Sequence, residues 1–161
     1  MKTRNQMKIV AEPGKQEMFI YREFDAPREA VFKAYTDPKL IVQWLGPDNM
    51  EMKIEKFDMK TGGSYRYIHS DGKGNSYGFH GSVHAVNAPQ RVIQTFEFEG
   101  LPETGHVILD TADFEQLPNN RCKLTIHSVY RSVSDRDGMV ASGMEAGMQQ
   151  GFEKLDAILT K

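Results

Sequence analysis

The segment of residues 19–47 constrains the fold most, because it joins a strand, two helix starts and a Trp-Leu-Gly-Pro turn with almost no linker. Residues 19–24 alternate between two faces and are rich in aromatic side chains, which predicts a β-strand. Asp25 and Asp37 each stand shortly before a proline, where an aspartate accepts hydrogen bonds from the free amides of a new helix. We therefore expect two short helices after the strand, with apolar residues Val31, Phe32 and Tyr35 in the first and Leu40, Ile41 and Trp44 in the second.

Beyond this segment the sequence predicts six further strands, separated by short turns rich in glycine, proline and asparagine. Connections this short suit antiparallel neighbours, because a parallel crossover needs a longer segment. The expected strands cover residues 50–58, 64–69, 76–86, 91–98, 106–117 and 121–130. Together with residues 19–24 they predict a seven-stranded antiparallel sheet.

Residues 134–159 change to the period of an amphipathic helix, opened by a loose capping box at Ser134. Gly143, Gly147 and Gly151 lie four residues apart in this expected helix, although each glycine costs about 1 kcal/mol relative to alanine. Missing side chains allow either close approach of the helix to the sheet or extra space in an internal pocket. The sequence leaves both explanations open.

Length and charge narrow the class of protein. The chain has 161 residues, which suits a single domain over residues 1–161, with residues 1–15 as an N-terminal extension. Its 20 basic and 22 acidic residues give a formal charge of −2, which argues against nucleic acid as a partner. No segment has the apolar length of a signal peptide or a bilayer span, so we expect a cytoplasmic protein with no membrane partner.

Cys122 is the single cysteine and has no Cys or His at metal spacing beside it. We expect it to be a small buried apolar residue. No phosphate-binding glycine loop follows a strand and precedes a helix, so the sequence predicts no cofactor and no metal.

The order of these elements and several short motifs resemble the START-like (SRPBCC) superfamily. Within it, the chain is similar to homologues of the activator of the heat-shock protein 90 ATPase. The matching motifs run almost from end to end and include Ala11-Glu12-Pro13-Gly14-Lys15, Asp25-Ala26-Pro27, Thr36-Asp37-Pro38, Trp44-Leu45-Gly46-Pro47, Gly62-Gly63 and Gly143-Met144-Glu145. The resemblance implies an α+β helix-grip fold, in which a curved antiparallel sheet wraps around the long C-terminal helix and encloses a cavity. It also implies binding of small molecules, with cyclases and hydrolases among the relatives.

Candidate ligand-binding residues lie on one strand and on the C-terminal helix. Tyr65, Tyr67 and His69 share one strand face, and each has an apolar body with a polar tip that could orient a ligand in an apolar pocket. Met144, Met148 and Phe152 on the helix and Trp44 near the turn complete the expected lining. Each of these residues could instead belong to an ordinary core.

No catalytic residue stands out. The five histidines, His69, His80, His84, His106 and His127, show no metal or nucleophile-base spacing, and His80 and His84 are expected at the surface or rim. The strand carboxylates Asp58, Glu97 and Asp110 are expected to point outward or lie at loop ends.

The sequence therefore predicts a cytoplasmic protein that binds a small hydrophobic or amphipathic molecule in a cavity between the C-terminal helix and the sheet. One alternative is a protein-interaction module, chaperone-related or homodimeric. Another is a cyclase- or hydrolase-type enzyme, which requires a buried histidine or carboxylate that faces the helix.

Overall fold

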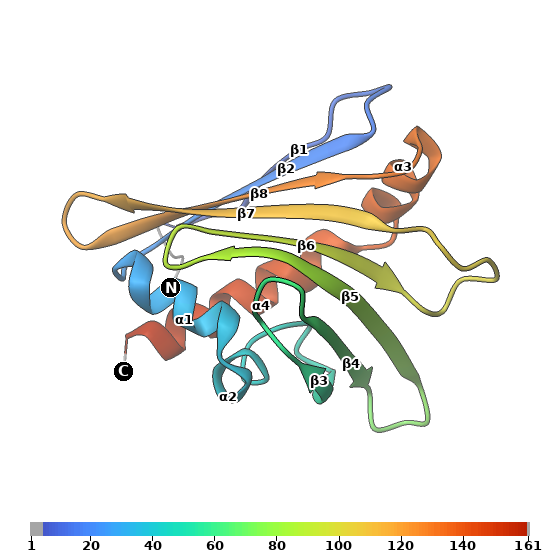
Figure 1. Ribbon diagram of the computed structural model, residues 1–161, viewed down its shortest axis with the longest axis horizontal. Helices are drawn as coiled ribbons and strands as arrows, with labels where there is room; N and C mark the ends of the chain where they lie inside the picture. Colours follow the sequence, from blue (N-terminus) through green and yellow to red (C-terminus); the bar gives the residue numbers. More distant parts are fainter. Residues whose placement is uncertain (1–4, 161) are drawn as a thin grey trace.

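In the computed structural model, which describes residues 5–160, an antiparallel sheet curves around a C-terminal helix (Figure 1). Its eight strands lie in the order β1-β2-β8-β7-β6-β5-β4-β3. They are β1 (Lys8–Val10), β2 (Glu17–Phe24), β3 (Glu51–Phe57), β4 (Ser64–Ser70), β5 (Ser76–Asn87), β6 (Arg91–Phe98), β7 (Ile108–Leu117) and β8 (Arg121–Val129). The helices are α1 (Arg28–Thr36), α2 (Pro38–Ile41), α3 (Val133–Ala141) and α4 (Met144–Leu159). This is the expected α+β helix-grip fold.

The predicted number of seven strands is wrong by one. The extra strand, β1, has three residues and pairs with β2 through Lys8 opposite Tyr21 and Val10 opposite Phe19. Three residues are too few to show a period of two, so the sequence pattern could not reveal this edge strand. β1 lies within the expected extension of residues 1–15, of which residues 1–4 lie outside the described part.

The helix starts agree with the sequence in part. Asp37 caps α2 as expected, because its carboxylate accepts a 2.8 Å hydrogen bond from the amide of Lys39. Asp25 does not cap α1; the N-cap is Pro27, and Asp25 instead accepts a 2.8 Å hydrogen bond from Arg121. The second expected helix ends at Ile41, so Trp44 lies in the following turn.

The single helix expected over residues 134–159 is in fact two helices. Ser132, rather than Ser134, caps α3 by accepting a 3.0 Å hydrogen bond from the amide of Asp135. Gly143 then separates α3 from α4 with φ of 84°, in the left-handed region that glycine adopts without strain. The hydrophobic period continues across the break, which explains why the pattern alone predicts one helix.

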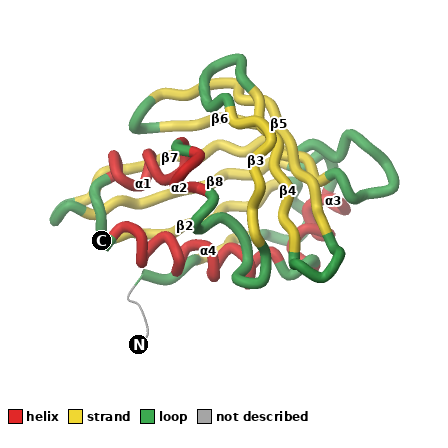
Figure 2. The backbone as a smooth tube through the Cα atoms, turned by 90° about the horizontal axis from the view of Figure 1, so that it is seen from below, coloured by secondary structure: helices red, strands yellow, loops and turns green. Residues whose placement is uncertain are grey.

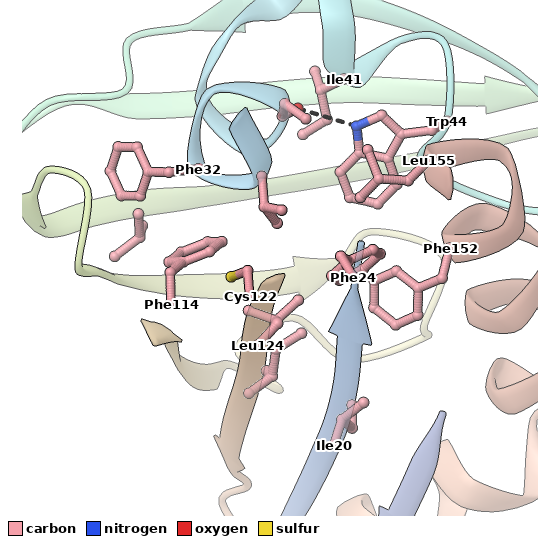
Figure 3. Close-up of a cluster of buried hydrophobic side chains, with 14 of the residues drawn as sticks. Ile20, Phe24, Phe32, Ile41, Trp44, Phe114, Cys122, Leu124, Phe152 and Leu155 are labelled. Carbon is pink, nitrogen blue, oxygen red and sulfur yellow. Dashed lines mark hydrogen bonds between the residues drawn. The ribbon is translucent and has the colours of Figure 1, made fainter. Parts of the chain in front are cut away.

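The helices α1 and α4 lie on the same side of the sheet (Figure 2). The strand β2 alternates strictly between half-buried and buried residues, and its buried residues face this side. They pack with residues of β8, α1 and α4 into an apolar core (Figure 3), whose largest fully buried side chains include Phe24, Trp44, Phe114, Leu124, Phe152 and Leu155. Within residues 5–160, no helix combines the length and the apolar character that crossing a bilayer requires.

Candidate functional site

The concave face of the sheet is packed unevenly. On β2 and β8 every inward side chain is buried, from Met18 to Phe24 and from Cys122 to Ser128. On β5, β6 and β7 several inward side chains keep accessible surface, and so do two methionines on the N-terminal half of α4. We call this set the inner surface: Phe79, Gln94, Phe96, Asp110, Ala112, Met144 and Met148.

A row of polar residues crosses the inner surface from strand to strand. Gln94 on β6 pairs with Asp110 on β7, and Asp110 pairs with Ser128 on β8. The Ser128 hydroxyl donates a 2.5 Å hydrogen bond to the carboxylate of Asp110. We call Gln94, Asp110 and Ser128 the polar row.

The inward direction of Asp110 corrects the sequence prediction. Asp110 was expected to point outward, but it lies on the same face of β7 as the buried residues Ile108 and Phe114. The other two carboxylates do lie outside: Glu97 accepts a 2.7 Å hydrogen bond from the amide of Gly105, and Asp58 lies in the turn after β3.

Burial raises the pKa of Asp110 to about 6, while the hydrogen bond from Ser128 and the charge of His127 act in the opposite direction. Within residues 5–160, no lysine, arginine or histidine forms an ion pair with this carboxylate. Asp110 is therefore an inward carboxylate whose one described hydrogen-bond donor is Ser128.

Four tyrosines lie within electrostatic range of Asp110. The predicted site residues Tyr65 and Tyr67 on β4 are buried and face inward, as the sequence indicates. Burial raises their pKa, and the negative charge of Asp110 raises it further. The same two causes raise the pKa of Tyr35 on α1 and of Tyr130 after β8. The charge of Asp110 thus raises the pKa of all four tyrosine hydroxyls.

The tyrosine hydroxyls differ in their partners. Tyr65 donates a 2.5 Å hydrogen bond to the carbonyl of Thr95, and the nearby hydroxyl of Ser128 lowers the pKa of Tyr130, against the effect of burial. Within the described residues, the hydroxyls of Tyr35 and Tyr67 have no hydrogen-bond partner and are not fully enclosed. Their oxygens are therefore accessible groups close to the inner surface.

His69 also faces inward, but it packs against the turn after α2. Its ring lies 5.1 Å from that of Tyr67, and a β-carbon on Gly46 would lie 2.7 Å from its Cε1. Burial and the positive charge of Lys154 lower the pKa of His69, so the ring is neutral at pH 7. Its Nε2 is buried without a hydrogen-bond partner among residues 5–160.

The glycines of α4 lie where the Trp-Leu-Gly-Pro turn packs against the helix. A β-carbon on Gly151 would lie 2.9 Å from the carbonyl oxygen of Trp44, so this glycine allows close packing. A β-carbon on Gly147 would meet Pro47 at an ordinary 3.7 Å. Of the two explanations that the sequence left open, close packing therefore accounts for Gly151.

The remaining predicted site residues divide into two groups. Met144 and Met148 are half-buried on the inner surface, where a ligand could touch them. Trp44 and Phe152 are 2% and 1% exposed in the core, so neither offers surface to a ligand in this structure. Trp44 donates a 3.0 Å hydrogen bond to the carbonyl of Ala34, the dashed line in Figure 3.

Three further histidines and a polar depression lie away from the inner surface. His80 pairs with Glu99 at 2.7 Å and His106 with Asp135 at 2.8 Å, and His84 is exposed. A polar depression of about 290 Å³ is lined by Asn5, Gln6, Glu23 and Arg121. The described residues contain no group of three or more His, Cys, Asp or Glu that could hold a metal ion.

Sequence reasoning missed Gln94, Asp110, Ser128, Tyr35 and Tyr130. For Asp110 a signal was available, because Ile108, Ala112 and Phe114 share its parity and mark the inward face of the strand. The same parity places Gln94 with Val92 and Phe96, and Ser128 with Leu124 and Ile126. The alignment of the three residues in one row has no such signal, since the register between strands does not follow from the period of any one strand.

Comparisons with known proteins agree with this fold. The family model described as Activator of Hsp90 ATPase homolog 1-like protein matches residues 25–160. A crystal structure from Rhodobacter sphaeroides has a TM-score of 0.85 at 26% identity, covering 95% of this chain and 99% of that one. A solution structure from Arthrobacter aurescens has a TM-score of 0.84 at 25% identity, covering 95% and 91%. The AHSA1 protein from Silicibacter pomeroyi has a TM-score of 0.73 at 23% identity, covering 89% and 97%. No curated protein matches the chain.

Proposed function

The chain belongs to the Activator of Hsp90 ATPase homolog 1-like family, and on this premise we propose that it binds a small amphipathic molecule between α4 and strands β5 to β7. Membership gives the fold, but one fold hosts many functions, so the function must be argued from the site. The buried, unpaired thiol of Cys122 suits a reducing compartment, and we propose a cytoplasmic location.

The observation that carries this proposal is the unequal burial of the concave face. A core that only stabilised the fold would bury its inward side chains on every strand, as β2 and β8 do. Phe79 and Phe96 instead stack with ring centroids 5.4 Å apart and are only half-buried, as is Met148, which packs against the same core as Phe96. Covering apolar surface yields about 25 cal/mol per Å², which is the driving force for uptake of an apolar molecule.

Methionine methyl groups report on this binding directly. We would label the methionine methyls with carbon-13, add 1-octanol and follow the methyl resonances by NMR. Met144 and Met148 should shift in a saturable manner, because they lie on the inner surface. Met18 should shift little, because it is fully buried in the core.

A matched pair of variants locates the binding. Ala112→Phe places a large ring on the inner surface and should abolish the octanol-dependent shifts. Thr111→Phe adds the same ring one residue away on the outer face of β7 and should leave them unchanged. Equal binding by both variants, or no saturable shift in the native protein, would refute the proposal.

A second candidate function, the cyclase- or hydrolase-type enzyme, is favoured by one observation. Asp110 is an inward carboxylate with a pKa near neutrality, the property that a general base or acid needs. Incubation of a metabolite extract with the native protein and with Asp110→Asn, followed by mass spectrometry, tests it. A compound consumed only by the native protein would support catalysis, and identical profiles would argue for binding alone.

A further inference from the structure

We propose that the molecule bound at the inner surface is an organic amine, whose protonated nitrogen pairs with the carboxylate of Asp110. This inference rests on the proposed function, because it names the chemical class of the ligand for the same site. It is carried by the position of Asp110 in the polar row, by the groups that surround it and by the partners that it lacks.

The polar row has apolar residues on both sides. On the inner face, Phe96 pairs with Ile108 at one side of the row, and Ala112 pairs with Ile126 at the other. A molecule that lies along this face therefore meets apolar surface around a polar centre. The arrangement fits an amphipathic ligand whose polar group reaches Asp110.

The polar row presents hydrogen-bond acceptors, and its one hydroxyl group already donates a hydrogen bond. Ser128 uses its hydroxyl hydrogen on Asp110. The side-chain oxygen of Gln94 is buried and has no hydrogen-bond partner among residues 5–160. A carboxylate is an acceptor-only group when ionised, so a ligand group that bonds Asp110 must supply an N–H or O–H donor. An anionic ligand would instead place like charges together.

Charge distinguishes an amine from an alcohol among the possible donors. Buried carboxylates in proteins are usually paired with a cation. Asp110 has no such partner in the described part of the chain; His127, whose charge acts on it, pairs at 2.8 Å with Glu17 and stacks on Phe19. A ligand ammonium would supply the missing positive charge.

Aromatic rings next to the row favour a cation as well. Tyr67, Phe79 and Phe96 stack in sequence, with centroids 5.2 Å and 5.4 Å apart. The faces of aromatic rings attract ammonium groups by about 0.5–2 kcal/mol, more when the cation is desolvated. The accessible hydroxyl oxygens of Tyr35 and Tyr67 add neutral acceptors near the same carboxylate.

Two inward groups other than tyrosines can change charge near this surface: Asp110, and His69 on β4, whose pKa is lowered by burial and by the positive charge of Lys154. From α4 the inner surface receives Met144 and Met148, which carry no charge. The titratable groups coupled to Asp110 are His127 on the outer face of β8 and four tyrosines whose pKa burial raises, namely Tyr35 from α1, Tyr65 and Tyr67 from β4, and Tyr130 after β8. The tyrosines therefore stay neutral across the range in which Asp110, with a pKa of about 6, loses its proton.

Three probes with one alkyl chain test the proposal: octylamine, 1-octanol and octanoate, each titrated into the full chain at pH 8. We expect octylamine to bind at least about tenfold more tightly than 1-octanol, because its ammonium group forms an ion pair with Asp110. Octanoate should bind most weakly, because its carboxylate repels that of Asp110. Asp110→Asn should bring octylamine and octanol within about twofold of each other. The control Asp113→Asn changes an outward carboxylate of the same strand, paired with Arg91, and should keep the amine preference.

A pH series on the native protein gives an independent answer, including the case in which Asp110→Asn does not fold. Alkylamines stay protonated between pH 5 and 8. Because the pKa of Asp110 is about 6, octylamine should bind about tenfold more weakly at pH 5 than at pH 8, with octanol unchanged.

The outcomes separate this inference from the proposed function. If octanol binds but octylamine binds no better at pH 8, the amine is refuted and the binding site survives. If the amine preference persists in Asp110→Asn, the role of Asp110 is refuted. If none of the three probes binds, the proposed function fails together with the inference.

Discussion

At the scale of single residues, the ionised carboxylate of Asp110 lowers the free energy of unfolding. Its pKa rises from 3.8 to about 6 on folding, because burial disfavours the ionised form. Below pH 3.8 the carboxyl is protonated in both folded and unfolded chains and costs nothing. Above about pH 6 the carboxyl is ionised in both states. The charge is less favourable in the folded state, which lowers the free energy of unfolding by up to about 3 kcal/mol. Such a cost at an inward position is typical of a functional group.

Asp110→Asn should therefore raise the free energy of unfolding at pH 7, by about 1–3 kcal/mol. The amide keeps an oxygen that can accept the hydrogen bond from Ser128 and removes the buried charge. Urea denaturation of both proteins at pH 7 and pH 4 measures the difference, which should nearly vanish at pH 4. A variant that is less stable at pH 7 would show that Asp110 is a stabilising residue.

Two glycines of α4 make a matched pair with opposite expected effects. Gly151→Ala should lower the free energy of unfolding by about 1–3 kcal/mol, because the new methyl would press on the Trp44 carbonyl at 2.9 Å. Gly147→Ala should raise it by up to about 1 kcal/mol, because alanine favours the helix and the methyl meets Pro47 at an ordinary distance. Thermal denaturation of both variants measures this, and equal effects would contradict the packing described here.

At the scale of elements, Gly143 sets where α3 ends and α4 begins. Gly143→Ala should lower the free energy of unfolding by about 1 kcal/mol, because alanine is strained at φ of 84°. Gly138→Ala, inside α3 with open space around it, should raise it by up to about 1 kcal/mol. Chemical denaturation of the pair checks this. A stabilised Gly143→Ala would indicate that one continuous helix is equally accessible.

The sequence predicts most elements because their hydrophobic period is long. The strands β4, β6 and β8 and the helix that holds Met144, Met148 and Leu155 all follow clear patterns. β1 is too short to show a pattern, and a break of two residues, Ser142 and Gly143, leaves the helical period almost intact. Ser132 and Ser134 are equally good caps by residue type, so only the backbone geometry decides between them.

At the scale of the whole molecule, the site depends on contacts between distant segments. Tyr65 and Tyr67 follow from the period of one strand, and Met144 and Met148 from one helix. The polar row needs the register of three strands, and Tyr35 comes from a helix far away in the sequence. The sequence also could not separate core residues from lining residues, as the burial of Trp44 and Phe152 shows.

The central claim is that the concave interior, rather than the outer face of the sheet, takes up the ligand. Nuclear Overhauser effects between the octyl chain of 1-octanol and protein protons test this most directly, because they arise only between protons of groups in close contact. The account predicts effects to the methyls of Met148 and Ala112 and to the ring of Phe96. Effects confined to the exposed outer residues Leu109 and Val129 would contradict it.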